Sequence, residues 1–396
     1  MQTTTETDLT TLEFVKSSIA RVQLWVEKRD YKGYEPFDGL SSWFRPLCFG
    51  NLLAERILMQ TVRQSPINLR PLFGISPKDS TKGRGYMASG YLYLHKQTGD
   101  ITYLQKAEAC LDWLDTHRCP HFENHSWSNH FDFAGRGGMY TKDSPIIVWT
   151  SLIGQAYLEA YEQTHNERWL KIADSASRWI INLPREKTDH GNCLSYLASE
   201  QSSIHNANML GAAVLARTAR HTGNKDNAEV ARSAMEYSCT RQLPDGSWWY
   251  AEDPKYHWFD NFHTGYNLDS LKCYINATGD DTWNPQLIKG LEFYKQHFFE
   301  ANGCPKYYHN RCHPIDSQCA GQAIETLALF SEIDPECLPL ACKVARWTIE
   351  NMQAKDGHFH YRHYPWGKAK TPMLHWGQAV IFKGLSVLAG KLAKAH

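Results

Sequence analysis

The sequence has no excess of charge of one sign, no long apolar run and no paired cysteine motif. Its 42 basic residues balance 42 acidic ones, which excludes the strongly basic surface typical of proteins that bind nucleic acids. No run of 18 apolar residues occurs, so a membrane-spanning helix is not predicted. The first residues, MQTTTETDLT, lack a basic stretch followed by an apolar core, so no signal peptide is predicted either.

The eleven cysteines are scattered and contain no Cys-x-x-Cys pair. In a chain without a signal peptide this pattern favours reduced core thiols in a cytoplasmic protein over a disulfide framework or a zinc site. The histidines show no compact ligand motif, so the sequence predicts no metal and no cofactor. Because no linker or low-complexity segment interrupts the chain, residues 1–396 are predicted to form a single domain.

A regular repeat is what the sequence does contain. Six glycines recur at intervals of 64, 57, 54, 56 and 56 residues, each inside an apolar helical pattern: Gly90, Gly154, Gly211, Gly265, Gly321 and Gly377. A glycine inside a helix costs about 1 kcal/mol relative to alanine. Its periodic use therefore indicates close approach between neighbouring helices of a repeat architecture.

A second set of glycines lies 18 to 20 residues before four of these helix glycines. A tyrosine follows each of them four or five residues later, and the pairs are Gly191 with Tyr196, Gly246 with Tyr250, Gly303 with Tyr307 and Gly357 with Tyr361. Glycine turns followed by alternating aromatic residues predict a tight turn and a short strand.

The repeat unit predicts an all-α fold of twelve helices in pairs, an (α/α)6 toroid with short strands in the loops at one mouth. Inner helices are expected to begin near residues 84, 145, 204, 262, 316 and 373, and outer helices to span about 103–117, 168–183, 226–241, 285–298 and 336–352. Residues 9–28 would supply the sixth outer helix and close the ring with the final helix, 373–393, which leaves 47–64 as an extra helix. An open α-solenoid is the alternative.

Aromatic residues and histidines gather in the turns that lead into the inner helices. These turns span residues 121–133, 246–263, 306–313 and 358–367. Aromatic rings stack on the C–H faces of sugars, so the cluster favours a glycan surface, although single rings could equally be wedges between helices. In a toroid all inner helices begin at one mouth, where their N-termini favour an anion. An acidic sugar such as a uronic acid is therefore the expected substrate.

The segment WFDNFHTGY, residues 258–266, is the strongest candidate for chemistry. We predict acid/base catalysis centred on Asp260 and His263, with His205, Tyr266, Asp316 and His375 in support. Both aspartates also suit a purely structural role as helix N-caps, and the histidines could be buried core residues. Glycoside hydrolysis needs two carboxyl groups, whereas a lyase or an epimerase needs proton transfer by histidine or tyrosine. The excess of histidine and tyrosine favours proton transfer.

Further side chains of the same turns and helix starts are predicted to bind the substrate. They are Trp248, Tyr250, Trp258, Asn208, Tyr308, His309, Arg311, Tyr361, Arg362, Trp376, Gln378 and, from the N-terminal loop, Asp38.

Two segments carry a family resemblance: YKGYEPFDGLSS, residues 31–42, and FDNFHTGYNLDSL, residues 259–271. They resemble a family of bacterial proteins associated with exopolysaccharide and surface-glycan biosynthesis, and the layout is distantly similar to unsaturated glucuronyl hydrolases and the helical domain of glucuronyl C5-epimerases. The resemblance implies an (α/α)6 fold, a glycan substrate and contact with polysaccharide-synthesis proteins.

Two other classes remain open from the sequence alone. A non-catalytic glycan-binding or scaffold protein would need the stacking aromatics without an acid/base pair. A terpenoid-cyclase-like barrel would present clustered aspartates in an apolar cavity, and neither DDxxD nor DxDD occurs.

Overall fold

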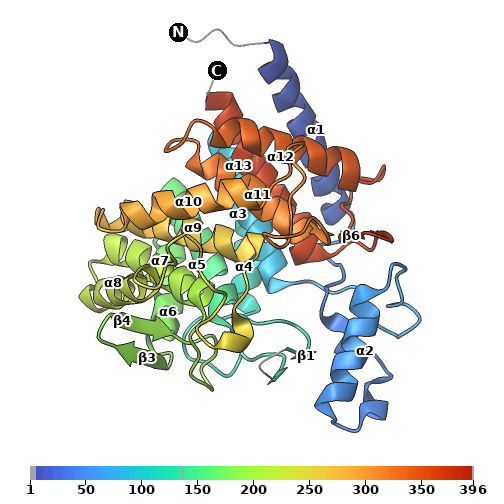
Figure 1. Cartoon of the computed structure of the whole chain (residues 1–396), viewed down its shortest axis with the longest axis horizontal. Coiled ribbons are helices and arrows are strands. Elements are labelled where there is room, and N and C mark those ends of the chain that lie inside the picture. The colour runs from blue at the N-terminus through green and yellow to red at the C-terminus, as the bar shows by residue number, and fades with distance from the viewer. Residues whose placement is uncertain (1–5, 136–137, 395–396) are drawn as a thin grey trace.

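The chain folds as a closed ring of helices (Figure 1). The computed structural model describes residues 6–135 and 138–394. The six inner helices are α3 (Thr81–Thr98), α5 (Ile147–Thr164), α7 (His205–Thr222), α9 (Asn261–Thr278), α11 (Ser317–Phe330) and α13 (Val380–Lys394). Each inner helix packs against the next, and α13 packs against α3. This closure confirms the (α/α)6 toroid and excludes the open solenoid.

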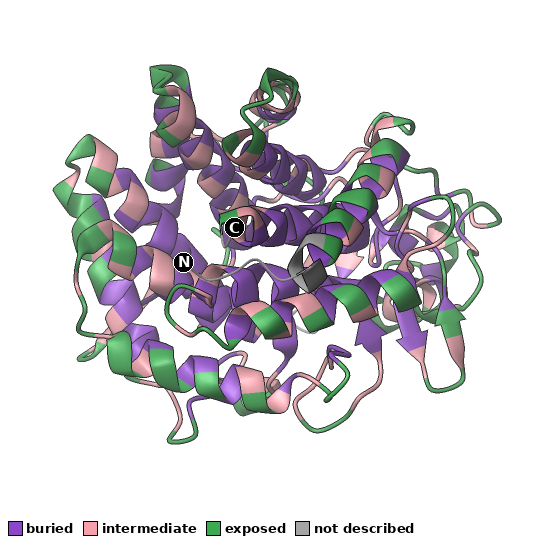
Figure 2. Ribbon diagram, turned by 90° about the horizontal axis from the view of Figure 1, so that it is seen from above, coloured by how far each residue is buried: buried purple, intermediate pink, exposed green. Residues whose placement is uncertain are grey.

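The outer layer also follows the sequence pattern. Its helices are α4 (Ile101–Thr116), α6 (Glu167–Ile181), α8 (Lys225–Cys239), α10 (Asn284–His297), α12 (Cys337–Met352) and, from the N-terminus, α1 (Glu6–Glu27). Helix α1 packs against α13 and α12. Figure 2 shows buried residues on the inner helices and on the inward faces of the outer ones, while exposed residues lie outside.

The helix glycines allow the close approach that their period indicates. A Cβ atom on Gly321 would lie 2.8 Å from the backbone nitrogen of Ile381, and one on Gly384 would lie 2.4 Å from the carbonyl oxygen of Gly321. Helices α11 and α13 therefore pack almost backbone to backbone. Gly154 is the exception, because its Cβ would meet Val214 at an ordinary contact distance of 3.4 Å.

The turn glycines join each helix pair to the next. All four have positive φ, between 84° and 102°, a conformation that only glycine adopts without strain. A Cβ on Gly246 would lie 2.3 Å from the carbonyl oxygen of Lys289 in α10, and one on Gly357 would lie 2.5 Å from that of Arg21 in α1. The turn of Gly246, which follows α8, therefore packs against the next outer helix, α10. The turn of Gly357, which follows α12, packs in the same way against α1.

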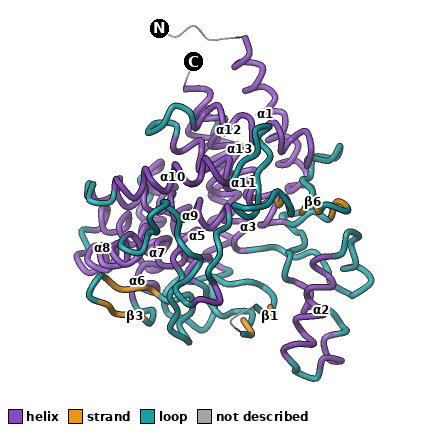
Figure 3. Tube along the Cα trace, viewed as in Figure 1, coloured by secondary structure: helices purple, strands orange, loops and turns teal. Residues whose placement is uncertain are grey.

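Short strands lie among the loops, as Figure 3 shows. They pair as β1 (Phe133–Ala134) with β2 (Met139–Tyr140), β3 (Arg185–Thr188) with β4 (Gly191–Leu194), and β5 (Ile315–Asp316) with β6 (Arg362–Tyr364) and β7 (Gly367–Ala369). The strands expected after Gly246 and Gly303 are absent from the described residues. Only isolated bridges form there, such as Ala251 with Ile204, because no second extended segment pairs with these turns.

Two details differ from the expected helix boundaries. The extra helix α2 (Leu52–Gln64) begins at its cap Asn51, after the short helices η1 (Asp38–Ser41) and η2 (Arg45–Cys48). The last inner helix opens with a π-helical turn, η4 (Leu374–Ala379), a rare conformation that is frequent at functional sites.

All eleven cysteines carry free thiols, eight of them buried. Within residues 6–135 and 138–394, no helix is long and apolar enough to span a bilayer.

Candidate active site

At the start of α9, the carboxylate of Asp260 makes two hydrogen bonds with one residue, His263. Asp260 caps the helix: its Oδ1 accepts a hydrogen bond from the backbone N–H of His263 (3.0 Å), and its Oδ2 lies 2.7 Å from Nδ1 of the same histidine. Since a carboxylate only accepts, Nδ1 carries the proton. Nε2, which forms no hydrogen bond within the described residues, is left as the basic nitrogen.

The start of the last inner helix repeats this arrangement. Oε1 of Glu35 accepts a hydrogen bond from the backbone N–H of His375 (3.0 Å) and lies 2.8 Å from its Nδ1. The Nε2 atom of His375 is buried without a partner. Burial lowers the pKa of His375, which favours the neutral ring whose Nε2 can accept a proton.

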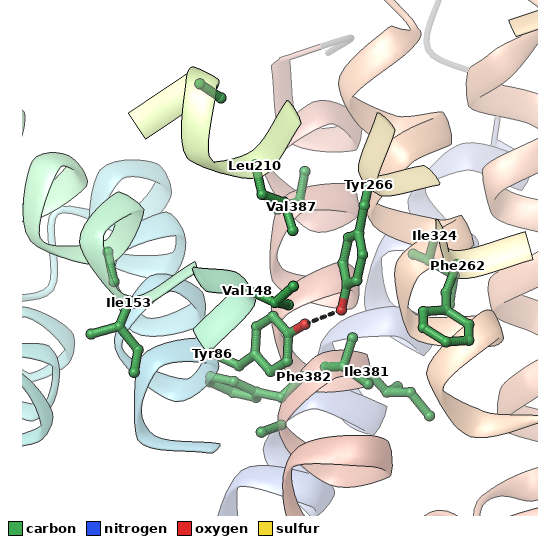
Figure 4. Packing of buried hydrophobic residues seen from close by; sticks show 14 of the residues in the cluster. Tyr86, Val148, Ile153, Leu210, Phe262, Tyr266, Ile324, Ile381, Phe382 and Val387 are labelled. Carbon is green, nitrogen blue, oxygen red and sulfur yellow. Dashed lines mark hydrogen bonds between the residues drawn. The ribbon is translucent and has the colours of Figure 1, made fainter. Parts of the chain in front are cut away.

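A lysine and two tyrosines form the floor between these histidines. The Tyr86 and Tyr266 hydroxyls are hydrogen-bonded at 2.6 Å (Figure 4), and Nε2 of Gln318 donates to Tyr266 at 3.0 Å. Nζ of Lys82 donates to the same hydroxyl at 3.3 Å and lies 4.7 Å from the ring centre of Trp149. Burial lowers the pKa of Lys82 to about 7, so about half of the amines are uncharged near neutral pH.

Ring contacts connect the two histidines across the mouth. The ring of His263 lies 6.3 Å from the ring of Tyr266, and the hydroxyl of Tyr266 accepts a hydrogen bond from Lys82. The amine of Lys82 lies over the ring of Trp149, and that ring lies 5.7 Å from the ring of His375. A chain of packed side chains from α9, α3, α5 and η4 therefore connects the two histidines near the start of the inner helices.

Several buried polar atoms at this mouth have no partner among the described residues. They are Nε1 of Trp149, Oδ1 of Asn206 and of Asn267, Oε1 of Gln318, Oε2 of Glu35 and Nε2 of His375. Leaving such an atom unbonded costs about 1–3 kcal/mol. Their gathering at one mouth fits a ligand rich in hydroxyl groups, which both donate and accept hydrogen bonds.

An aromatic groove leads to this mouth. A cavity of about 650 Å³ is lined by Trp249, Lys255, His257, Trp258, Phe259, Tyr308, His309, Asn310 and Arg311. Trp258 also lines a smaller space of about 10 Å³ beside His263, together with Asn206 and Asn267. That smaller volume is close to what one water molecule needs, so the groove narrows sharply at the histidine.

Two of the six expected catalytic residues have structural contacts instead. His205 is buried with both ring nitrogens bonded, Nδ1 to Ser238 at 3.1 Å and Nε2 to Glu252 at 2.7 Å. Asp316 caps α11 and binds Nε of Arg362 at 2.6 Å and Nε1 of Trp376 at 2.8 Å. Both side chains are therefore held by internal contacts, and their part in catalysis stays a prediction.

The expected substrate-binding residues divide into two groups. Those lining the groove or the small space are Trp248, Tyr250, Trp258, Tyr308, His309 and Arg311. The others form contacts inside the protein. Asn208 accepts a hydrogen bond from the backbone of Leu194, and Gln378 accepts one from the backbone of Phe359. Tyr361 is hydrogen-bonded to Arg63, Arg362 and Trp376 both donate to Asp316, and Asp38 pairs with Arg70 at 2.9 Å. In this second group the polar groups stabilise the loops at the mouth, and substrate binding by these residues stays a prediction.

Sequence reasoning missed Glu35, Lys82 and Trp149. Glu35 lies in the segment YKGYEP, whose distance in sequence from His375 hid their pairing. Lys82 and Trp149 occupy the first turns of inner helices, where the repeat phase could have pointed to them. No group of three or more His, Cys, Asp or Glu residues suited to a metal ion occurs in the described part of the chain.

Comparison with protein families assigns the chain. Residues 121–361 match the model of glycosyl hydrolase family 76. The chain belongs to this family. As a member of glycosyl hydrolase family 76 it is a glycan-active enzyme, which favours the enzyme prediction over a scaffold. The comparison with curated proteins gives no significant match. The resemblance to exopolysaccharide-associated proteins and to glucuronyl enzymes stays a prediction.

Solved structures share the fold of this family 76 member at low sequence identity. The cellobiose 2-epimerase of Bacillus thermoamylovorans superposes with a TM-score of 0.60 at 10% identity, covering 80% of this chain and 88% of that one. The family 76 α-mannanase of Bacteroides thetaiotaomicron gives 0.61 at 13%, covering 78% and 86%. A D-mannose isomerase gives 0.61 at 10%, covering 80% and 88%. Both hydrolases and epimerases thus use this barrel.

Proposed function

We propose that the enzyme moves a proton at the carbon next to the carbonyl group of a reducing sugar, as an epimerase or aldose–ketose isomerase. The observation that carries the proposal is the matched pair His263 and His375. Each histidine has its Nδ1 on a carboxylate, and within residues 6–135 and 138–394 Nε2 of His375 is buried without a partner while Nε2 of the half-buried His263 forms no hydrogen bond. Two oriented imidazoles at one mouth supply an acid and a base.

The chemistry needs only proton transfers. One neutral imidazole takes the proton from C2 of the open-chain sugar, and the electron pair forms the C1–C2 double bond while O1 gains a proton. The resulting enediol is reprotonated at C2 from the opposite side while O1 returns its proton, which gives the epimer, or it is protonated at C1 while O2 loses its proton to a base, which gives the ketose. Histidine suits both directions because its pKa lies near neutral pH.

The developing negative charge on O1 would be stabilised by this mouth. The amine of Lys82 lies at the floor, and the N-termini of the inner helices supply N–H groups and positive dipole ends. This is also why an anionic substituent on the sugar suits the site.

Hydrolysis is supported less well by the carboxyl groups of the mouth. Asp260 and Asp316 each accept three hydrogen bonds, whereas Asp143 and Glu200 are exposed in the loops. Glu35 alone has an unpartnered buried oxygen there within the described residues. A glycosidase of the usual kind needs two carboxyl groups across the bond that breaks.

A comparison with the Salegentibacter α-1,6-mannanase points the same way. A variant of that enzyme in which two aspartates are replaced by asparagine is described as inactive and binds α-1,6-mannotriose. The two replaced aspartates are consecutive in that chain. The only consecutive aspartates here are Asp280 and Asp281, in the turn after α9 at the opposite end of the barrel. Hydrolysis is the second candidate function, favoured by the family match.

The test is incubation in deuterated water with mannose, glucose, cellobiose, two uronic acids and α-1,6-mannotriose, followed by mass spectrometry and NMR. We expect deuterium at C2 of the epimer or at C1 of the ketose, without chain cleavage. His263→Asn and His375→Asn should each lower the exchange rate by about 10²- to 10⁴-fold. His117→Asn, at an exposed position, is the matched control.

Other outcomes distinguish the alternatives. Cleavage with addition of water and no ring deuterium would assign hydrolysis, and an unsaturated product would assign a lyase. Binding of a sugar without turnover would contradict the proposal and would support the alternative of a non-catalytic glycan-binding or scaffold protein. The uronic-acid substrate, the role in surface-polysaccharide metabolism, the partners in polysaccharide synthesis and the cytoplasmic location are part of the proposal.

A further inference from the structure

The exposed apolar side chains of the molecule gather in one place, residues 42–75, which we call the apolar lobe. Of the fourteen large hydrophobic residues that are exposed in the described part of the chain, nine belong to this lobe: Trp43, Phe44, Leu47, Phe49, Leu52, Leu53, Ile57, Ile67 and Leu72. Figure 1 shows its helix α2 outside the ring of helices, next to β1 and far from the termini. Contiguous exposed apolar surface of this extent marks an interaction site.

Helix α2 is apolar on its outer side as well as on its inner side. Met59 is 1% exposed and packs with Leu40 and Ala134, whereas Leu53 and Ile57 on the other side are 65% and 60% exposed. A helix that is apolar all round is normally covered on every side. The inner contacts hold α2 on the protein, and its outer side has no covering partner within the described residues.

Two loops extend this surface beyond α2. The backbone N–H of Trp43 donates to the carbonyl oxygen of Phe73 at 3.3 Å, and the rings of Phe44 and Phe73 lie 5.0 Å apart. The two loops therefore lie side by side. Phe49 is 90% exposed and has a left-handed backbone with φ of 49°, which is unfavourable for a bulky residue. A phenylalanine held in this way in the solvent indicates a role in binding, because the fold gains no contact from it.

The apolar lobe presents no charge to the solvent. None of the exposed residues from 41 to 77 is charged. The charged residues of this stretch are buried or half-buried and have partners inside the protein: Arg45 pairs with Glu55 and Asp132, Arg56 donates to the carbonyl oxygen of Gly135, Arg63 donates to the hydroxyl of Tyr361, and Arg70 pairs with Asp38. Protein interfaces keep a polar rim, whereas the hydrocarbon of a bilayer excludes charge. The charge pattern therefore favours lipid over a second protein surface.

Cations lie beside the lobe instead of on it. Arg63 near the end of α2 bonds Tyr361, the residue before β6, so the β6–β7 hairpin leaves the barrel next to the lobe. This hairpin exposes Trp366, Lys368 and Lys370 and contains no acidic residue. Tryptophan is enriched at the surface of membranes, and lysine is attracted to anionic head groups. The hairpin thus complements the head groups as the lobe complements the hydrocarbon.

We propose that the apolar lobe enters one face of a lipid bilayer, with the β6–β7 hairpin at the head groups, and so holds the enzyme at a membrane surface. Such an anchor lies in the interface without spanning it and sinks its apolar face by about 5–10 Å. Arg63 lies over the ring of Phe37, which contacts Trp376 at the start of the last inner helix. Docking therefore brings the mouth of the barrel beside the bilayer. The proposal does not rest on the reaction proposed for the mouth.

The experiment is flotation of the whole protein with vesicles of phosphatidylcholine, and with vesicles of phosphatidylcholine and phosphatidylglycerol in equal amounts. We expect the protein to float with both kinds of vesicle, because burial of the apolar side chains drives the binding. The mixed vesicles should bind more tightly at low salt only, since salt screens the attraction between the lysines and anionic lipid.

Phe49→Asp and Leu53→Asp each place a carboxylate on the lobe. Each should weaken binding to both kinds of vesicle at least tenfold, since charge is unfavourable in hydrocarbon. Both positions are exposed, and aspartate tolerates the left-handed conformation at residue 49 better than phenylalanine does, so both variants should unfold in urea like the parent. Ile288→Asp, at an exposed position on α10 outside the lobe, is the matched control and should bind like the parent.

Other outcomes would overturn the proposal. A folded protein that floats with neither vesicle would do so, as would binding to the mixed vesicles alone that high salt abolishes and Phe49→Asp leaves unchanged. Sedimentation equilibrium without lipid tests the other occupant, because a dimer that Phe49→Asp dissociates would assign the lobe to a second copy of the chain. Deuterium exchange on soluble sugars should be unchanged in Phe49→Asp, so the two proposals fail or stand separately.

Discussion

One carboxylate at the start of α9 serves both the helix and the chemistry. The Asp260 side chain satisfies the backbone N–H of His263 as an N-cap and fixes the ring of the same residue through Nδ1. Glu35 does the same for His375 from a distant loop. In each case the backbone bond sets the position of the residue and the ring bond sets its tautomer.

The Asp260→Asn variant isolates the second of these roles. The asparagine oxygen still caps α9, but its amide N–H₂ meets Nδ1 and favours the tautomer with the proton on Nε2. We expect kcat for proton exchange to fall by about 10²- to 10⁴-fold, and because Nε1 of Trp258 also loses its acceptor, the unfolding free energy should fall by about 1–3 kcal/mol. Asp100→Asn, at the cap of α4, should leave both quantities unchanged, and an unaltered kcat in Asp260→Asn would contradict the assigned role.

Lys82 predicts a dependence of stability on pH. Its pKa falls from an ordinary 10.5 to about 7 on burial, so between these values the unfolded chain binds more protons and stability rises with pH. Lys82→Met removes this penalty, and we expect a gain on the order of 4 kcal/mol at pH 7 that shrinks toward pH 10.

Urea unfolding at pH 7 and pH 9.5 measures this difference. Lys289→Met, an exposed change on α10, provides the control and should show no pH-dependent gain. If Lys82→Met raises the unfolding free energy equally at both pH values, burial does not lower the pKa of the Lys82 amine.

At the scale of the element, the turn glycines decide how each helix pair meets the next. Gly357 combines a positive φ of 102° with a Cβ position 2.5 Å from a carbonyl oxygen of α1. Gly99 has a similar φ of 69°, but nothing lies within 4 Å of its Cβ position. Both glycines therefore have a positive φ, and only Gly357 also lies against a neighbouring backbone.

This pair gives a test of close approach. Gly99→Ala should cost about 1 kcal/mol, because only the left-handed conformation is strained. Gly357→Ala should cost at least 3 kcal/mol, since the backbone of α1 must also move. Thermal unfolding of both variants measures the difference, and equal losses would show that φ alone requires glycine at this turn.

At the scale of the whole molecule, closure depends on packing between the two ends of the chain. Helix α1 lies against α13 and α12, and its residues Val15, Ile19, Val22 and Val26 are at most 3% exposed. The last inner helix, α13, therefore takes its outer partner, α1, from the opposite end of the chain.

Val22→Asp tests whether this seam stabilises the ring. An uncompensated charge in the core should lower the unfolding free energy by several kcal/mol, while Leu24→Asp, on the exposed side of α1 at 51% exposure, should stay within about 0.5 kcal/mol. Circular dichroism during urea unfolding measures both. Equal, small effects would mean that α1 packs loosely and the barrel is stable without it.

The barrel architecture could be predicted because it depends on local and periodic features of the sequence. Glycine spacing, polar breaks such as Thr98-Gly99-Asp100 and apolar periodicity placed the helices within a few residues of their observed bounds. The hairpins after Gly246 and Gly303 could not be predicted correctly, because a strand needs a partner that lies elsewhere in the chain.

The sequence by itself determined the helix pairs, the mouth at which the aromatic turns gather, and His263 with its cap Asp260, since all of these depend on neighbours within a few residues. Only the tertiary structure decided that Glu35 orients His375, that Lys82 is buried with its amine over the ring of Trp149, and that His205 and Asp316 are held by internal hydrogen bonds. The physical reason is that the availability of a polar atom depends on every group packed around it, and in a closed ring those groups come from distant parts of the chain.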